Sequence, residues 1–100
     1  METKATFNVQ PSDMQKRIAY ARQLRNDNGQ STIVLFEIGK TYEAYDESAE
    51  IIHQYCHTFI VYEKTFTFTD FKMKCEDWIF PLLIKKGYKL AIITKEFMNY

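Results

Sequence analysis

Gly39, Lys40 and Thr41 form the tripeptide that ends the phosphate-binding loop of nucleotide-hydrolysing proteins, and they directly follow the apolar run IVLFEI. In the complete motif, G-x-x-x-x-G-K-[ST], an earlier glycine opens a loop whose backbone N–H groups surround the phosphates. Val34 occupies that position here, inside the apolar run, and the residues after Thr41 are typical of an extended chain rather than a helix. The sequence therefore argues against a nucleotide-phosphate site.

His53 and His57 have the i, i+4 spacing at which two helical side chains can share a metal ion, and Cys56 is adjacent to the second. On a helix, however, Cys56 points about 60° to one side of that pair. No carboxylate lies between the histidines as in H-E-x-x-H. Because no serine or cysteine is arranged with a histidine for nucleophilic catalysis either, we expect no metal, no cofactor and no catalytic residues.

The composition is that of one ordered domain, with 46% apolar and 16% aromatic residues and only 3 Gly and 2 Pro. Lysine plus arginine balances aspartate plus glutamate, 13 against 13, so no global field draws the chain toward a polyanion.

The longest nearly apolar run, WIFPLLI, is far shorter than the roughly 20 residues that span a bilayer. The N-terminus lacks a secretory signal, and Cys56 and Cys75 form no C-x-x-C pattern. We therefore expect a cytoplasmic protein with buried, reduced cysteines and no membrane contact.

Residues 1–10 are polar and without periodicity, which predicts a flexible arm, and residues 11–100 form a single domain. Ser12 with Gln15 matches a capping box that would begin a helix. Asn28 and Gly29 can take the left-handed conformation that ends it. The helix has one apolar face at helical spacing, made of Met14, Ile18, Ala21 and Leu24.

Residues 31–38 are apolar on both parities, which predicts a central strand covered on both faces. The chain then alternates through 40–43, so Tyr42 would point inward and Thr41 and Glu43 outward. Asp46 is suited to cap a helix that runs to about His57. The inward face of that helix would hold Ala49, Ile52 and Cys56, with Ile51 and Tyr55 beside it.

Residues 58–62 and 65–69 are typical of strands, with Phe66 and Phe68 on one face of the second. The last helix begins near Asp77 and ends at Gly87, and Trp78 is expected in the core. Residues 88–94 form the closing strand. The order of elements predicts an α/β fold: a mixed β-sheet with helices packed on it.

Two segments resemble the N-terminal domain of the MutS family of DNA mismatch repair proteins. The segment VLFEIGKTYEAYDESAEII resembles its opening, where a strand leads into Gly-x-Phe-Tyr-Glu and an acidic helix start. The segment DFKMKCEDWIFPLLIKKGYKLAII resembles a later part, with an aromatic residue, a helix containing proline, a glycine and an apolar strand. With the first helix, the resemblance covers nearly all of residues 11–96. The 100 residues hold no counterpart of the family's connector, lever, clamp and ATPase domains, so we expect a stand-alone domain.

The resemblance implies a DNA-binding site. In the family, the Phe of Phe-x-Glu wedges beside a mispaired base from the minor groove, and the Glu hydrogen-bonds that base. By position, Glu43 matches the Glu, whereas Thr41 stands at the position of the Phe and has no aromatic face to stack. Lys40 beside the motif, and Lys72 and Lys74 near Phe71, are candidate phosphate contacts.

Two functions follow from these observations. The first is a non-catalytic module that binds duplex DNA, mismatched duplexes included, alone or with a protein partner that supplies further domains. The second is a protein-interaction module that kept the fold and lost contact with DNA. Their responses to salt differ, because only DNA binding by lysines releases counterions.

Overall fold

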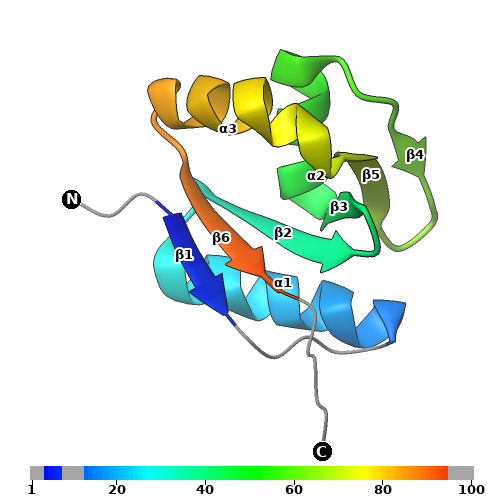
Figure 1. Cartoon of the computed structure of the whole chain (residues 1–100). Helices are drawn as coiled ribbons and strands as arrows, with labels where there is room; N and C mark the ends of the chain where they lie inside the picture. The colour runs from blue at the N-terminus through cyan, green and yellow to red at the C-terminus, as the bar shows by residue number, and fades with distance from the viewer. Residues whose placement is uncertain (1–3, 8–12, 95–100) are drawn as a thin grey trace, which may run out of the picture.

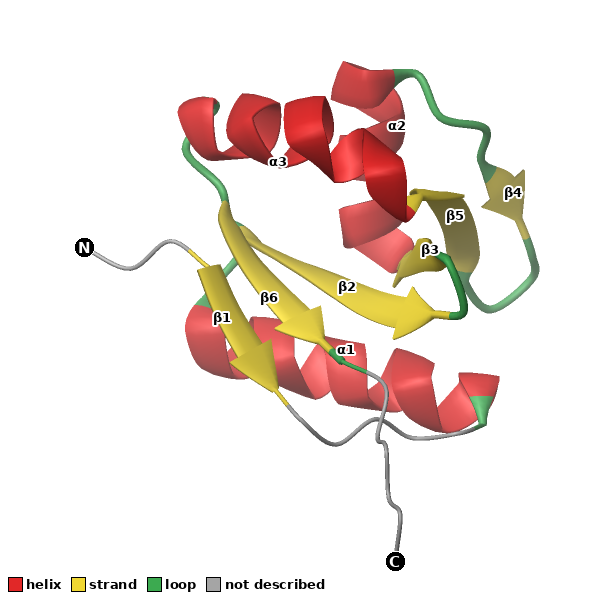
Figure 2. Cartoon of the chain, viewed as in Figure 1, coloured by secondary structure: helices red, strands yellow, loops and turns green. Residues whose placement is uncertain are grey.

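The computed structural model describes residues 4–7 and 13–94, and it describes side chains for residues 13–94. One mixed sheet forms the middle layer, and helices cover both of its faces (Figures 1 and 2). Helix α1 (Met14–Asn28) lies on one face, and α2 (Asp46–Cys56) and α3 (Glu76–Lys85) lie on the other. The predicted α/β class and mixed sheet are therefore confirmed.

The sheet contains six strands in the described residues, in the order β1-β6-β2-β3-β5-β4. Strands β1, β6 and β2 are parallel, whereas β3, β5 and β4 add to the sheet by antiparallel pairing. Their bounds are β1 Lys4–Phe7, β2 Thr32–Ile38, β3 Thr41–Tyr45, β4 Val61–Tyr62, β5 Thr67–Lys72 and β6 Lys89–Ile93.

Strand β2 separates two cores, as expected for a run that is apolar on both parities. Ile33 and Leu35 face α2 and α3, and Val34 and Phe36 face α1. All four side chains are fully buried. The predicted faces of α1 and α2 are confirmed by the burial of Ile18, Ala21, Leu24, Ala49, Ile52 and Cys56.

The sequence prediction was wrong for part of the N-terminal arm. Lys4–Phe7 form strand β1, which pairs in parallel with β6 from Lys4 opposite Leu90 to Phe7 opposite Ile93. A four-residue edge strand is too short to show a periodicity, and its backbone hydrogen bonds leave no trace in the sequence. The rest of the predicted arm, and the predicted cap Ser12, lie outside the described residues.

Two helix starts differ from the sequence prediction. Asp13 is the N-cap of α1, where its carboxylate accepts the N–H of Gln15 at 2.7 Å. Asp46 does not cap α2, since its carboxylate instead accepts hydrogen bonds from Arg22 at 2.6 Å and from the Thr67 N–H at 3.3 Å. The predicted ends of α1 and α3 are confirmed: Gly29 is the C-cap of α1, Gly87 follows the C-cap of α3, and both have a positive φ of 99°, although Gly29 is not in the left-handed helical conformation.

Trp78 is half exposed, so its predicted place in the core is wrong. The inward face of α3 is formed by Ile79, Phe80 and Leu83. Successive helical residues are rotated by about 100°, which turns Trp78 away from that face. A large aromatic side chain thus remains at the surface of the helix.

The predicted strands 58–62 and 65–69 shift in the structure. Strand β4 covers only Val61–Tyr62, and β5 begins at Thr67 and continues to Lys72. A four-residue loop joins them, closed by the Glu63 N–H donating to the Phe66 carbonyl at 2.8 Å. Glu63 and Lys64 are poorly suited to a two-residue turn, which needs positive φ. The extension of β5 brings Lys72 to the edge of the candidate site.

Candidate nucleic-acid interface

The Gly-Lys-Thr tripeptide forms a hairpin turn. Gly39 has φ of 59°, in the left-handed region that glycine adopts without strain, and Ile38 pairs directly with Thr41 across the turn. The Thr41 hydroxyl donates back to the Ile38 carbonyl at 3.0 Å. Strand β3 follows at once, so the chain does not continue into the helix that a phosphate-binding loop requires.

The end of β5 lies beside this turn. Thr41 is opposite Lys72 in the β3–β5 ladder, and the Met73 N–H donates to the Lys40 carbonyl at 2.9 Å. After Lys72 the chain enters the short 3-10 helix η1 (Met73–Cys75), which leads into α3. Two segments more than 30 residues apart in sequence are thereby fixed side by side through their backbones.

An open hollow of about 480 Å³ lies where these segments meet. We call it the lysine hollow, and its lining residues are Lys40, Thr41, Lys72, Met73 and Lys74. Four of the five residues that the sequence predicted for DNA contact are thus brought together. The lysines are exposed, whereas Thr41 and Met73 are half-buried.

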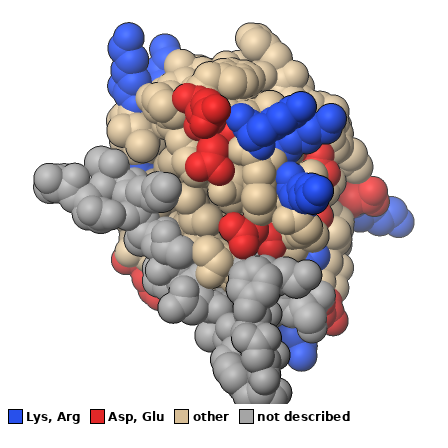
Figure 3. Space-filling view, in the orientation of Figure 1, with Lys and Arg blue, Asp and Glu red and all other residues tan. Residues whose placement is uncertain are grey.

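No carboxylate lines the lysine hollow, and within residues 13–94 none of its lysines is in a salt bridge. On the face shown in Figure 3, acidic and basic side chains are interspersed, with no broad field of one sign. A balanced net charge is thus compatible with a local cationic site. Ammonium groups above a partly apolar surface can bind phosphates, but the lining includes no histidine, cysteine or carboxylate for acid–base or nucleophilic chemistry.

Glu43, the fifth predicted residue, lies outside the hollow. Its side chain is only 14% exposed and lies 3.6 Å from the Arg17 guanidinium of α1. The Tyr45 hydroxyl donates to the Glu43 carboxylate at 2.6 Å and accepts from Arg17 Nε at 3.0 Å. The predicted outward face is therefore wrong for Glu43, because α1 covers this part of the sheet. Its assignment as a base contact stays a prediction that this geometry does not favour.

Glu43 also affects a carboxyl group on the neighbouring strand β5. Asp70 pairs directly with Glu43 in the β3–β5 ladder. Burial, together with the charge of Glu43, raises the pKa of the Asp70 carboxyl above its usual value. On the other face, burial raises the pKa of Tyr42, whose hydroxyl donates to Glu76 at 3.0 Å. Tyr42 thus points inward as predicted and is 5% exposed.

The histidines and cysteines do not converge. His57 has φ of 60° and ends α2, and the His53 Nδ1 is hydrogen-bonded to the Thr58 carbonyl. Burial raises the pKa of the Cys56 thiol to about 11, so this buried thiol is unreactive at neutral pH. In residues 13–94, the structure contains no group of His, Cys, Asp or Glu that could hold a metal ion.

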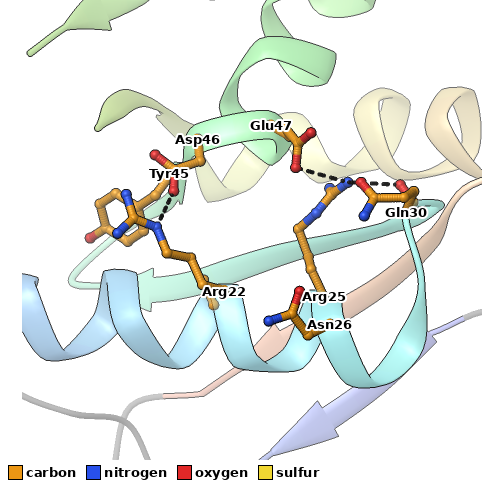
Figure 4. A pocket seen from close by; sticks show the side chains of 8 residues that line it. Arg22, Arg25, Asn26, Gln30, Tyr45, Asp46 and Glu47 are labelled. Carbon is orange, nitrogen blue, oxygen red and sulfur yellow. Dashed lines mark hydrogen bonds and ion pairs between the residues drawn. The ribbon is translucent and has the colours of Figure 1, made fainter. Parts of the chain in front are cut away.

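A second, smaller cavity of about 80 Å³ lies between α1 and the start of α2 (Figure 4). Its two arginines are engaged by carboxylates, since Arg22 lies 2.6 Å from Asp46 and Arg25 lies 3.4 Å from Glu47. Arg25 also donates to Gln30 and to the Thr32 carbonyl. These contacts hold α1 against the start of α2 and the start of β2. We therefore interpret this cavity as a structural feature rather than a ligand site.

Sequence reasoning missed three contributors to these sites. Arg17 and Arg25 are buried on α1, although a helical apolar pattern assigns arginine to the solvent side. Their acidic partners, Glu43 on β3 and Glu47 on α2, lie on other elements, so no local spacing in the sequence indicates these pairings. Met73 was overlooked because a single methionine between lysines shows no periodicity.

Fold and site together define an α/β domain with a basic hollow at one end of a mixed sheet. The family model for MutS domain I matches residues 18–97, and the chain therefore belongs to the MutS domain I family. The resemblance seen in the sequence is confirmed. A search of curated proteins found no match to the chain. In the described residues, no helix is long and apolar enough to cross a membrane.

Proposed function

We propose that this chain is a non-catalytic module that binds duplex DNA through the lysine hollow, with mismatched duplexes as its preferred ligands. The observation that carries the proposal is the convergence of Lys40, Lys72 and Lys74 on one hollow that no carboxylate lines. Membership of the MutS domain I family supports it. The proposal assigns Lys40, Lys72 and Lys74 to phosphate contacts and Thr41 to the surface that faces the bases.

Because the proposed site is small, we expect weak binding to a short stretch of the duplex. Three lysines can neutralise at most a few phosphates, and each phosphate contact contributes about −0.9 to the slope of log affinity against log salt concentration. The net charge of +0 adds no long-range attraction. Full affinity would then require low salt or a protein partner that adds further contacts.

Fluorescence anisotropy of labelled matched and mismatched duplexes at two salt concentrations tests this proposal. We expect binding at low salt that weakens steeply as salt is added, with the mismatched duplex bound more tightly because a mispaired base is easier to unstack. The absence of binding to either duplex at low salt would falsify the proposal for the isolated chain.

One observation favours a second function, the recognition of a protein partner. The segment before and within β4, the last strand of the sheet in the described residues, exposes three large apolar side chains: Phe59 at 51%, Val61 at 36% and Tyr62 at 67%. Exposed apolar clusters at a sheet edge are typical of protein contacts. Such binding would be nearly independent of salt, so the anisotropy series separates the two functions.

A further inference from the structure

We propose that Met73 is the apolar side chain that enters the base stack when the lysine hollow binds DNA. This inference rests on the proposed DNA binding. It assigns to Met73 the wedging part that Thr41, with its short polar side chain, cannot perform.

Met73 is the only large apolar residue that lines the hollow. The large apolar side chains that are exposed in the described residues, Phe59, Val61, Tyr62 and Trp78, do not line it. The hydroxyl of Thr41 is turned back to the Ile38 carbonyl at 3.0 Å. Met73 is therefore the lining residue with the largest apolar side chain to offer a base.

The backbone fixes Met73 beside the three lysines of the lining. Its N–H donates to the Lys40 carbonyl at 2.9 Å, and it directly follows Lys72, the partner of Thr41 in the ladder. Lys72 and Lys74 flank it in sequence and are exposed. Phosphates held by these lysines would place the base edges of the bound groove over Met73.

The burial of Met73 suits a wedge. Its side chain is half-buried and packs against the core that contains Tyr42 and Phe71, so it has a rigid support beneath it. Methionine is unbranched and adapts its shape, and it is among the apolar side chains that proteins insert between base steps from the minor groove. Insertion costs less at a mismatch, which would couple Met73 to mismatch preference.

The test uses a mismatched duplex with 2-aminopurine beside the mispair, whose fluorescence rises when the base unstacks. Met73→Gln keeps the length of the side chain but makes its end polar, and Met73→Leu keeps it apolar. Met14→Gln, at another half-buried methionine, which lies at the start of α1 and packs against the core on the other face of the sheet, is the matched control. Circular dichroism and a urea titration confirm that each variant is folded.

We expect the wild type, Met73→Leu and Met14→Gln to raise the fluorescence. With Met73→Gln, most of the fluorescence rise should be lost. The ratio of its affinities for the mismatched and matched duplexes should fall roughly fivefold, with an unchanged salt slope. An equal fluorescence rise with Met73→Gln, or no rise with the wild type although it binds, would overturn the role of Met73 and leave DNA binding intact. If the wild type binds no duplex at low salt, the proposed function itself fails, and the role of Met73 with it.

Discussion

Thr41 lies directly opposite Lys72 in the antiparallel pairing of β3 with β5, and the adjacent Met73 donates its N–H to the Lys40 carbonyl at 2.9 Å. These backbone contacts join the tip of one hairpin to the end of a distant strand. The lysine hollow therefore depends on the register of the sheet, and its residues are positioned by main-chain hydrogen bonds rather than by long side chains.

Thr41→Phe should increase the affinity for a mismatched duplex relative to a matched one. Thr41 is half-buried at the rim of the hollow, and a phenyl ring there adds a stacking surface worth roughly 1 to 3 kcal/mol per base. Anisotropy titrations of both duplexes at low salt provide the measurement. An unchanged ratio of the two affinities would show that residue 41 does not face the bases. Thr65→Phe, at an exposed loop position outside the hollow, is the matched control.

Glu43→Ala should lower the free energy of unfolding by about 2 kcal/mol, because it leaves the buried Arg17 guanidinium without this carboxylate and removes the acceptor of the Tyr45 hydroxyl. Urea denaturation measures the change. Glu47→Ala is the control, since its side chain is 64% exposed and its ion pair with Arg25 should contribute less than about 1 kcal/mol. Equal midpoints for the two variants would contradict the structural role of Glu43.

Asp70→Asn should stabilise the protein at pH 7. The folded-state pKa of Asp70 is raised above its usual value of 3.8, so the folded state binds the proton more tightly than the unfolded state does. Ionisation of the carboxyl therefore lowers the stability of the wild type as pH rises through the folded-state pKa. The asparagine side chain does not ionise, so the variant keeps this stability.

The stabilising effect of Asp70→Asn should shrink as the pH falls below 3.8, where the wild-type carboxyl is protonated in both states. Thermal unfolding from pH 3 to pH 7 follows the difference, with Glu63→Gln at an exposed loop position as the control. A stabilisation that stays constant over this range would rule out titration of Asp70 as its cause.

Ser48→Ala should cost about 1 to 3 kcal/mol of stability, since it leaves a buried backbone donor unsatisfied. Strand β2 pairs with β3 only from Phe36 to Ile38. The Val34 N–H lies outside this pairing and donates to the Ser48 hydroxyl at 3.0 Å. Both residues are at most 1% exposed. Ser31→Ala, at an exposed position before β2, should change the urea midpoint little, and a similar small change with Ser48→Ala would refute this account.

Most of the fold could be predicted because its signals are local. The continuous apolar run of β2, the helical spacing of Ile18, Ala21 and Leu24, and the glycines after α1 and α3 each reflect a physical requirement of one element. The order and class of the elements followed from these signals. Strand β1 did not, because an edge strand of four residues is stabilised by backbone pairing with β6 rather than by its own pattern.

The candidate site could be predicted only in part. The resemblance indicated Lys40, Thr41, Lys72 and Lys74, and the register of β3 against β5 shows why these residues meet. Glu43 was misplaced, because strand alternation gives the face of a side chain but not what covers that face. Arg17, a long side chain that buries its stem, reaches Glu43 from another element, and only the packing of α1 on the sheet reveals that contact.

The salt dependence of DNA binding by lysine variants shows whether the lysine hollow is the DNA-binding site. A mismatched duplex is titrated at several salt concentrations with the wild type, with a variant in which Lys40, Lys72 and Lys74 are replaced by alanine, and with Lys85→Ala as a control at an exposed position on α3. If the lysines contact phosphates, the triple variant loses most of the affinity and its salt slope falls by up to about 2.7, whereas Lys85→Ala behaves like the wild type. Equal slopes for the triple variant and the wild type would contradict DNA binding through the lysine hollow.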